Sequence, residues 1–200
     1  MSDFQGDGTE YVGEHYNGVN ASCSELRGKE FEGCNFKDCD FSEARLRSCK
    51  FIECNFENCN LSLADFSYSR FADVVFENCK LVGVDWTKLD WPTLVLCAPI
   101  SFKQCILNDA SFFGLNLEDL VLEGCKAHDV DFREANLSEA NLGYTDFSHS
   151  LFGNTNLRNA DLAEASRYDI DIQTCEIKGA KFCRDEAVNL LLGLGIELVD

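Results

Sequence analysis

Large apolar residues recur at every fifth position along most of this chain. The first run is Leu26, Phe31, Phe36, Phe41, Leu46, Phe51, Phe56, Leu61, Phe66, Phe71, Phe76, Leu81, Trp86, Trp91 and Leu96. The register then slips by one residue, and the second run is Phe102, Leu107, Phe112, Leu117, Leu122, Ala127, Phe132, Leu137, Leu142, Phe147, Phe152, Leu157, Leu162, Arg167, Ile172, Ile177 and Phe182. Only Ala127 and Arg167 lack a large apolar side chain. A period this long and regular indicates a repeat architecture.

A period of five fits neither an α-helix nor a β-strand, whose side chains repeat every 3.6 and 2.0 residues. The chain can place all of these large side chains on one side only if it turns every five residues. Two residues before each large residue stands a small one, often Cys or Ala. The residue directly before it is often Asp or Asn, which stabilise turns through bonds to neighbouring backbone. The pattern therefore predicts stacked coils with the large residues inside.

This pattern resembles the A(D/N)Lxx motif of the pentapeptide-repeat family over residues 26–182. The resemblance implies an all-β fold, a right-handed quadrilateral parallel β-helix in which four pentapeptides form one coil. Eight coils stacked at the spacing of neighbouring strands give a rod on the order of 40 Å long. The outward positions are the residue before each large residue and the two residues after it.

Nine of the twelve cysteines occupy the small position of the repeat, two residues before a large one. A thiolate metal cluster is the alternative interpretation, but zinc ligands must converge on one point. Because these cysteines recur on successive sides of the rod, we expect reduced core thiols, no metal and no cofactor. Free thiols in such number also favour a reducing compartment.

The formal net charge is −18, from 35 Asp and Glu against 17 Lys and Arg. This charge disfavours binding to nucleic acid or to an anionic membrane and favours a basic protein partner. Neither a membrane-spanning segment nor a signal peptide is evident, so we expect a cytoplasmic protein. The three histidines, His15, His128 and His149, have no nucleophile beside them in the repeat, and we expect no enzyme activity.

Five segments follow from the register: an N-terminal cap (1–25), a first stack (26–96), a joint (97–101), a second stack (102–183) and a C-terminal cap and dimerisation segment (184–200). The joint region contains Trp91, Pro92 and Pro99. Because proline removes a backbone donor, we expect imperfect pairing there. A contact site for a partner is the alternative interpretation of this break.

The C-terminal segment has a different pattern, a short helix over 184–193 followed by a strand over 195–200. Its apolar side chains exceed what one solenoid cap buries. We therefore expect a two-fold dimer interface. Its predicted residues are Leu190, Leu191, Leu192, Leu194, Ile196 and Leu198.

Acidic residues at outward positions 20 residues apart should stack on one side of the rod, as Glu53 over Asp73, Glu57 over Glu77 and Asp119 over Glu139. A solvated surface is the alternative interpretation. Duplex DNA carries about 24 charges over 40 Å, against a net 18 here, so the charge density is similar to that of DNA. The predicted partner-binding residues are Glu53, Glu57, Asp73, Glu77, Glu118, Asp119, Glu134 and Glu139.

Residues 96–100 (LCAPI) and 186–198 (EAVNLLLGLGIEL) resemble the joint and the C-terminal module of the Qnr, McbG and AlbG group. That resemblance implies a DNA mimic that binds DNA gyrase or topoisomerase IV and protects it from quinolones or albicidin, conferring antibiotic resistance. Some Qnr members carry projecting loops, whereas the unbroken register over 26–96 predicts none here. A structural or scaffold protein with an unrelated basic partner is the alternative.

Overall fold

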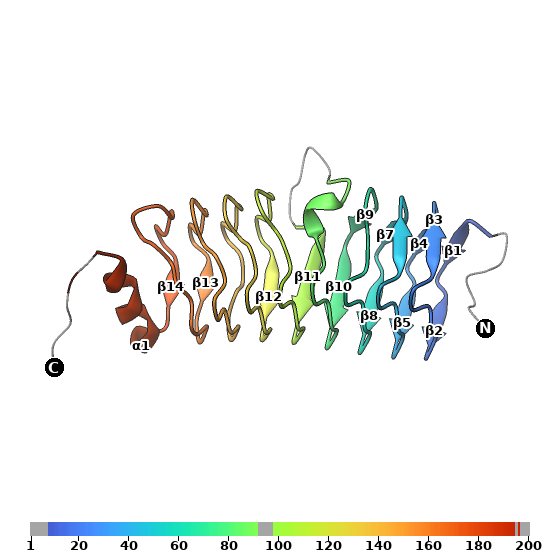
Figure 1. The fold of residues 1–200 in the computed structure, drawn as a ribbon, viewed down its shortest axis with the longest axis horizontal. Coiled ribbons are helices and arrows are strands. Elements are labelled where there is room, and N and C mark those ends of the chain that lie inside the picture. The colour runs from blue at the N-terminus through green and yellow to red at the C-terminus, as the bar shows by residue number, and fades with distance from the viewer. Residues whose placement is uncertain (1–7, 92–97, 195, 197–200) are drawn as a thin grey trace.

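The computed structural model of the protein describes residues 8–91, 98–194 and 196, and the side chains of all of these but 192 and 193. The described chain forms a straight rod of stacked coils, with its two ends at opposite ends of the rod (Figure 1). It is a right-handed quadrilateral parallel β-helix of about eight turns, which confirms the predicted fold class.

Each coil contributes short strands that pair with the coils above and below. The strands are β1 (Glu10–Val12), β2 (His15–Asn17), β3 (Glu25–Arg27), β4 (Glu30–Glu32), β5 (Asn35–Lys37), β6 (Arg45–Arg47), β7 (Lys50–Ile52), β8 (Asn55–Glu57), β9 (Arg70–Ala72), β10 (Val74–Glu77), β11 (Ile100–Lys103), β12 (Val121–Glu123), β13 (Asp161–Leu162) and β14 (Lys181–Phe182). The sheets have the orders β1-β4-β7-β9, β12-β11-β10-β8-β5-β2, β3-β6 and β13-β14. All of these strands pair in parallel, as stacking of successive coils requires.

The large residues of the repeat form four ladders inside the rod, one for each side of the coil. We number the sides by the first ladder residue: side 1 is built on Tyr11, side 2 on Tyr16, side 3 on Ala21 and side 4 on Leu26. Equivalent residues of neighbouring coils stack directly, as Phe36 does on Phe56 with ring centroids 4.5 Å apart. The small residues two positions earlier, such as Cys34 and Ala44, are also fully buried. The core is therefore continuous along the rod.

The turn between sides depends on one recurring backbone conformation. The second residue after most of the large ones has a positive φ, as in Gly33 (61°), Asp38 (52°) and Glu43 (56°). This conformation aims the chain at the next side of the square, and glycine, asparagine and aspartate adopt it at the lowest cost. The outward positions predicted from the repeat are confirmed, because the side chains at the two other positions are buried in most pentapeptides.

The N-terminal boundary predicted from sequence is wrong. Residues 10–25 are not a separate cap, because β1 pairs with β4 and β2 pairs with β5 in the register of the repeat. Tyr16 is buried and stacks on Phe36 with ring centroids 5.1 Å apart. A weaker apolar pattern still forms a coil here, because the neighbouring coil supplies its hydrogen-bond partners. Residues 1–7 of the predicted cap lie outside the described part of the chain.

The register break is larger than the sequence predicted. Equivalent residues lie 26 positions apart across it, since Phe76 pairs with Phe102, whereas they lie 20 apart in neighbouring coils, as in Phe56 with Phe76. The coil therefore holds six additional residues, and the prediction that no insertion interrupts 26–96 is wrong. The regular ladder ends at Trp86, where the 3-10 helix η1 (Trp86–Lys88) begins.

Trp91 follows a residue that is still in register, since the Asp90 N–H donates to the Ser69 carbonyl at 2.9 Å, and it packs against the core without being buried in it. Its side chain is half-buried, and its indole N–H donates a hydrogen bond to the Trp86 carbonyl at 2.8 Å. Regular pairing has resumed at Pro99, whose carbonyl accepts from the Val74 N–H at 3.0 Å. The predicted joint at 97–101 thus extends too far, because β11 already begins at Ile100. Pro92 and Leu96 lie outside the described residues.

A second irregularity lies at Arg167, the charged residue in the predicted ladder. Arg167 is turned outward, and Tyr168 and Ile170 are buried instead. Ile170 pairs with Phe152, 18 residues earlier, so the chain shifts locally to keep apolar side chains inside. The charged guanidinium stays in solvent because burying it unpaired would cost far more than this shift.

Asp146 holds the Arg167 side chain in this arrangement. Its carboxylate accepts from Arg167 Nε at 3.0 Å and from Ser148 Oγ at 2.7 Å, and it lies 2.8 Å from His128 Nε2. Burial alone would raise the pKa of Asp146, but the hydrogen bonds from Ser148 and His128 outweigh it and lower the pKa to about 2. Three successive coils thus meet at one carboxylate.

The helix predicted over 184–193 is present, but only its first turn is α-helical. The α-helix α1 (Arg184–Ala187) is followed by the 3-10 helix η2 (Val188–Leu194). Leu190 of η2 is buried against the ladders, so this segment caps the last coil. The strand predicted over 195–200 lies outside the described residues except for Ile196, which is not in a strand. No helix of the described residues is long and apolar enough to cross a bilayer.

We predict that replacing the ladder residue Phe102 with Ala lowers the free energy of unfolding by about 4 kcal/mol. Phe102 is fully buried between Phe76 and Trp86, so its loss leaves a cavity that neighbouring coils cannot close. The matched control is Phe113→Ala, whose ring is 42% exposed and lies 5.7 Å from the Arg133 guanidinium. Denaturant titration should show a loss below about 1 kcal/mol for the control; equal losses would contradict the ladder.

We also predict that Asp146 stabilises the fold in a pH-dependent manner. Because its folded pKa is depressed to about 2, its contribution is complete above its unfolded pKa and is lost as the pH falls toward 2. Asp146→Asn should therefore lower the free energy of unfolding by about 2 kcal/mol at pH 7 and by much less near pH 2. Asp109→Asn, at an exposed aspartate without an ion pair, is the control. A deficit of Asp146→Asn that does not change with pH would contradict this assignment.

Candidate protein-binding surface

The acidic residues singled out from the repeat lie on the surface in the stacking predicted for them. Glu53 and Asp73 occupy equivalent turn positions in neighbouring coils, linked by the hydrogen bond from the Glu53 N–H to the Ala72 carbonyl at 2.8 Å. Glu57 and Glu77 are direct partners in the pairing of β8 with β10. The Asp119 N–H likewise donates to Ser138, beside Glu139, at 3.0 Å. The three predicted stacks are confirmed.

The eight predicted residues do not share one side of the rod. Side 1 carries five of them, in the outward positions after its ladder residues: Glu53, Asp73, Glu118, Asp119 and Glu139. Glu57 and Glu77 lie on side 2, and Glu134 lies on side 4. The predicted set thus divides into a main group and two smaller ones.

Side 1 remains one surface across the inserted residues. The Val74 N–H donates to the Pro99 carbonyl at 3.0 Å, and the Ala98 N–H donates to the Glu118 carbonyl at 3.0 Å. The column that contains Glu53 and Asp73 therefore continues through Pro99 to Asp119 and Glu139. Acidic residues of the two stacks are aligned along the rod.

Sequence reasoning missed the N-terminal part of this surface. Glu10, Glu30 and Glu32 also lie on side 1, because β1 and β4 pair there in register. Glu30 and Glu32 flank Phe31 in the predicted first stack, so the five-residue register already places them on this side. Glu10 precedes residue 26 and would have been identified by extending the register back to Tyr11. We call the full group the acidic side, which consists of Glu10, Glu30, Glu32, Glu53, Asp73, Glu118, Asp119, Glu139 and Glu176.

Few cations compensate the acidic side. Lys50 pairs with Glu30 at 2.5 Å, Arg158 lies 3.7 Å from Glu176, and Arg70 pairs with Asp90, which adds a tenth carboxylate to this side. Lys178 is the fourth cation there. At the outward positions of side 1 that the structure describes, ten carboxylates against four cations leave a net charge of −6. Like charges in neighbouring coils repel by about 1 kcal/mol per pair in water.

Side 2 has mixed charge instead. Glu57 accepts from Lys37 at 2.6 Å, and this hydrogen bond raises the pKa of the lysine ammonium. Glu77 pairs in register with Lys103, which in turn pairs with Glu123. Because lysines lie next to the acids of this column, Glu57 and Glu77 are partly neutralised and contribute less to attraction of a cationic partner.

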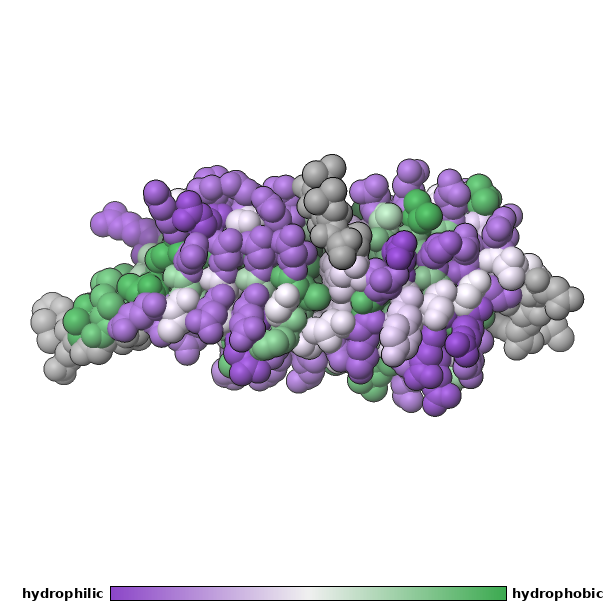
Figure 2. All heavy atoms as spheres, turned by 90° about the horizontal axis from the view of Figure 1, so that it is seen from above, coloured by the Kyte–Doolittle hydropathy of each residue, from purple (hydrophilic) through white to green (hydrophobic). Residues whose placement is uncertain are grey.

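The C-terminal end presents the main apolar part of the surface in Figure 2, over α1 and η2. Leu191, Leu194 and Ile196 are 38%, 46% and 45% exposed, as an interface would require. Leu190 is only 8% exposed within its own chain, so its assignment to a dimer interface is wrong. Val188, at 45% exposed, was missed. The side chain of Leu192 and all of Leu198 lie outside what the structure describes.

The buried cysteines are poor metal ligands and nucleophiles. Burial raises the pKa of the Cys54 thiol to about 11. Hydrogen bonding to the next thiol along the ladder raises the pKa of Cys79 and Cys105 to about 12. These thiols remain protonated at neutral pH, whereas a metal ligand must be a thiolate. Among the described residues, no group of three or more potential ligands is arranged to hold a metal ion.

Comparison with known proteins places this geometry in a family. The family profile for the pentapeptide repeat region matches residues 29–98 and 97–182. A trypsin-treated variant of QnrB1, described as a plasmid-mediated fluoroquinolone resistance protein, superposes with a TM-score of 0.57 at 24% identity, covering 100% of this chain and 94% of that one. Full-length QnrB1 gives a TM-score of 0.53 at 24% identity, covering 94% and 97%.

No curated protein sequence matched the chain. The structural likeness concerns the fold, since the identity is low, but the family profile covers both stacks of the rod. The five-residue register, the four internal ladders and this match lead to the same assignment: the chain belongs to the pentapeptide-repeat family.

Proposed function

We propose that this chain mimics DNA and binds a bacterial type II topoisomerase, DNA gyrase or topoisomerase IV. By occupying the enzyme's DNA-binding surface, it would protect the enzyme from poisons such as quinolones or albicidin and confer resistance. The acidic side carries this proposal, because it aligns carboxylates along the rod where few cations compensate them.

Charge density supports the comparison with DNA. Duplex DNA carries one charge per 1.7 Å, or about 24 over 40 Å, and the protein carries a net 18 on a rod of about that length. Because about a third of this excess, a net charge of −6, lies on side 1, a basic groove built for DNA is the complementary partner. The fold similarity to QnrB1, described as a fluoroquinolone resistance protein, agrees with this choice of target.

Dimerisation would extend the acidic surface. The exposed Leu191, Leu194 and Ile196 lie at the end of the rod, so a two-fold contact there would join two rods end to end. In this proposal the protein acts by binding, without catalysis, in the cytoplasm where the topoisomerase works.

We predict that neutralising side 1 abolishes protection of gyrase. The variant combines Glu53→Gln, Asp73→Asn, Glu118→Gln, Asp119→Asn and Glu139→Gln. Supercoiling by purified gyrase is measured with ciprofloxacin and with albicidin over a range of protein concentrations. The wild-type protein should restore supercoiling, and the variant should require at least about tenfold more protein, since each lost charge weakens attraction to a basic surface.

The matched control removes five carboxylates from sides 2 and 3, at Asp38, Glu43, Asp109, Asp129 and Glu164, in the same amide form. It has the same net charge as the side 1 variant, so only the position of the lost charges differs. Equal loss of activity in both variants would contradict the assignment to side 1. Failure of the wild-type protein either to inhibit gyrase at high concentration or to restore it under drug would refute the topoisomerase proposal.

We also predict that Leu191→Glu combined with Ile196→Glu converts a dimer to a monomer. Two charges placed in an apolar contact would be desolvated without partners, which opposes association. Light scattering measures the mass in solution. Leu63→Glu, at an exposed leucine of the coil surface, is the control and should leave the mass unchanged. A dimer mass that persists in the double variant would rule out this interface.

A further inference from the structure

Side 4 carries a hollow whose charge is opposite to that of the rest of the rod. It is lined by Arg27, Arg47, Ser48, Ser67 and Tyr68. Arg27 and Arg47 are direct partners in the pairing of β3 with β6, so both side chains project from neighbouring coils on the same side. Two arginine side chains that start from backbone positions one strand spacing apart repel each other where their guanidinium groups approach, and an anion between them relieves this repulsion.

The chain supplies only one counterion to this pair. Asp65 of the next coil accepts from Arg47 Nε at 2.7 Å, and its other oxygen accepts from the Ser67 N–H at 3.0 Å and from the Ser67 hydroxyl. Desolvation opposes ionisation, but these hydrogen bonds lower the pKa of Asp65, so it stays charged. With both oxygens engaged, Asp65 has no lone pair directed at Arg27.

Three donors in the hollow remain without partners. Among the residues that the structure describes, neither the Arg27 guanidinium, nor the Ser48 hydroxyl, nor the Tyr68 hydroxyl makes a hydrogen bond or ion pair. Tyr68 is 75% exposed, although tyrosine has a large apolar ring. The Arg47 guanidinium, which also lines this hollow, is the fourth hydrogen-bond donor group there.

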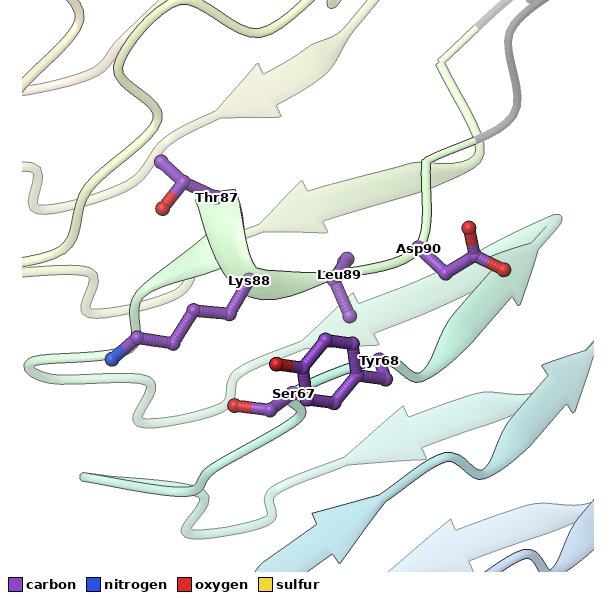
Figure 3. A pocket seen from close by; sticks show the side chains of 6 residues that line it. All are labelled: Ser67, Tyr68, Thr87, Lys88, Leu89 and Asp90. Carbon is purple, nitrogen blue, oxygen red and sulfur yellow. The ribbon is translucent and has the colours of Figure 1, made fainter.

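A second hollow adjoins the first and shares Ser67 and Tyr68 with it. It is lined further by Thr87, Lys88, Leu89 and Asp90. Figure 3 shows the Tyr68 ring beneath Leu89, with the hydroxyls of Tyr68 and Ser67 pointing the same way. Lys88 is neutralised by Asp85 at 3.0 Å, and Asp90 by Arg70. This second hollow thus offers the Tyr68 ring and Leu89 without net charge.

From these contacts we infer that side 4 binds a phosphate monoester. Two oxygens of a planar carboxylate would be satisfied by one guanidinium, whereas a tetrahedral phosphate can accept from two guanidiniums and two hydroxyls at once. The organic part of the ester then lies over Tyr68 and Leu89 in the second hollow. This site lies on a different side from the acidic side and does not depend on the proposed function.

The test is NMR of the arginine Nε–H groups of the whole protein during titration at constant ionic strength. Inorganic phosphate and phenyl phosphate are the probes. The Arg27 resonance, identified by its absence in Arg27→Gln, should shift and saturate with both probes. Phenyl phosphate should bind more tightly than phosphate, and Tyr68→Asn, which keeps a residue suited to the φ of 62°, should remove that difference.

Arg45→Gln is the matched control, because Arg45 lies on side 4 in the same strand as Arg47 but does not line the hollow. Binding should survive in Arg45→Gln and weaken at least about tenfold in Arg27→Gln, the effect of one lost charge-assisted contact. Shifts of all arginine resonances without saturation, or equal weakening in the two variants, would overturn the proposal. Binding of duplex DNA but of neither probe would also overturn it.

Discussion

Backbone hydrogen bonding between coils is the interaction on which the rest of the structure depends. Each pentapeptide is too short to bury anything by itself, and most of its backbone N–H and C=O groups find their partners in the coils above and below. Once coils stack, equivalent residues come into register, so Phe56 stacks on both Phe36 and Phe76. The same register stacks surface residues, which converts a weak sequence repeat into continuous columns of like side chains.

The two irregularities show how strongly this register is maintained. Six residues are inserted between Asp90 and Ala98, yet Phe102 continues the ladder of Phe76. At Arg167 the pairing partner shifts, and Tyr168 and Ile170 enter the core in its place. In both cases the backbone changes its path and the core remains packed. Loss of a ladder side chain would destabilise the coils on both sides of it, because each ladder residue packs against both.

The surface follows a different rule from the core. Its columns of side chains differ among the sides of the rod. Side 1 is acidic, side 2 has mixed charge, and side 4 holds the Arg27 and Arg47 pair. Although the net charge of the protein is −18, its rod therefore has both a negatively charged side and a local positively charged site. The proposed topoisomerase contact and the proposed phosphate site use different sides, so one fold can present both without competition between them.

The sequence by itself determined the coil, the ladders and the outward positions, because a five-residue period leaves only one way to bury so many Phe and Leu. It also determined that Glu53 stacks on Asp73, since stacking follows from the period. Only the tertiary structure decided which side each residue joins, since that depends on counting inserted residues such as the six near Trp91. It also decided that Leu190 is buried while Leu191 is exposed, because helix type and docking on the last coil set which side chains turn inward.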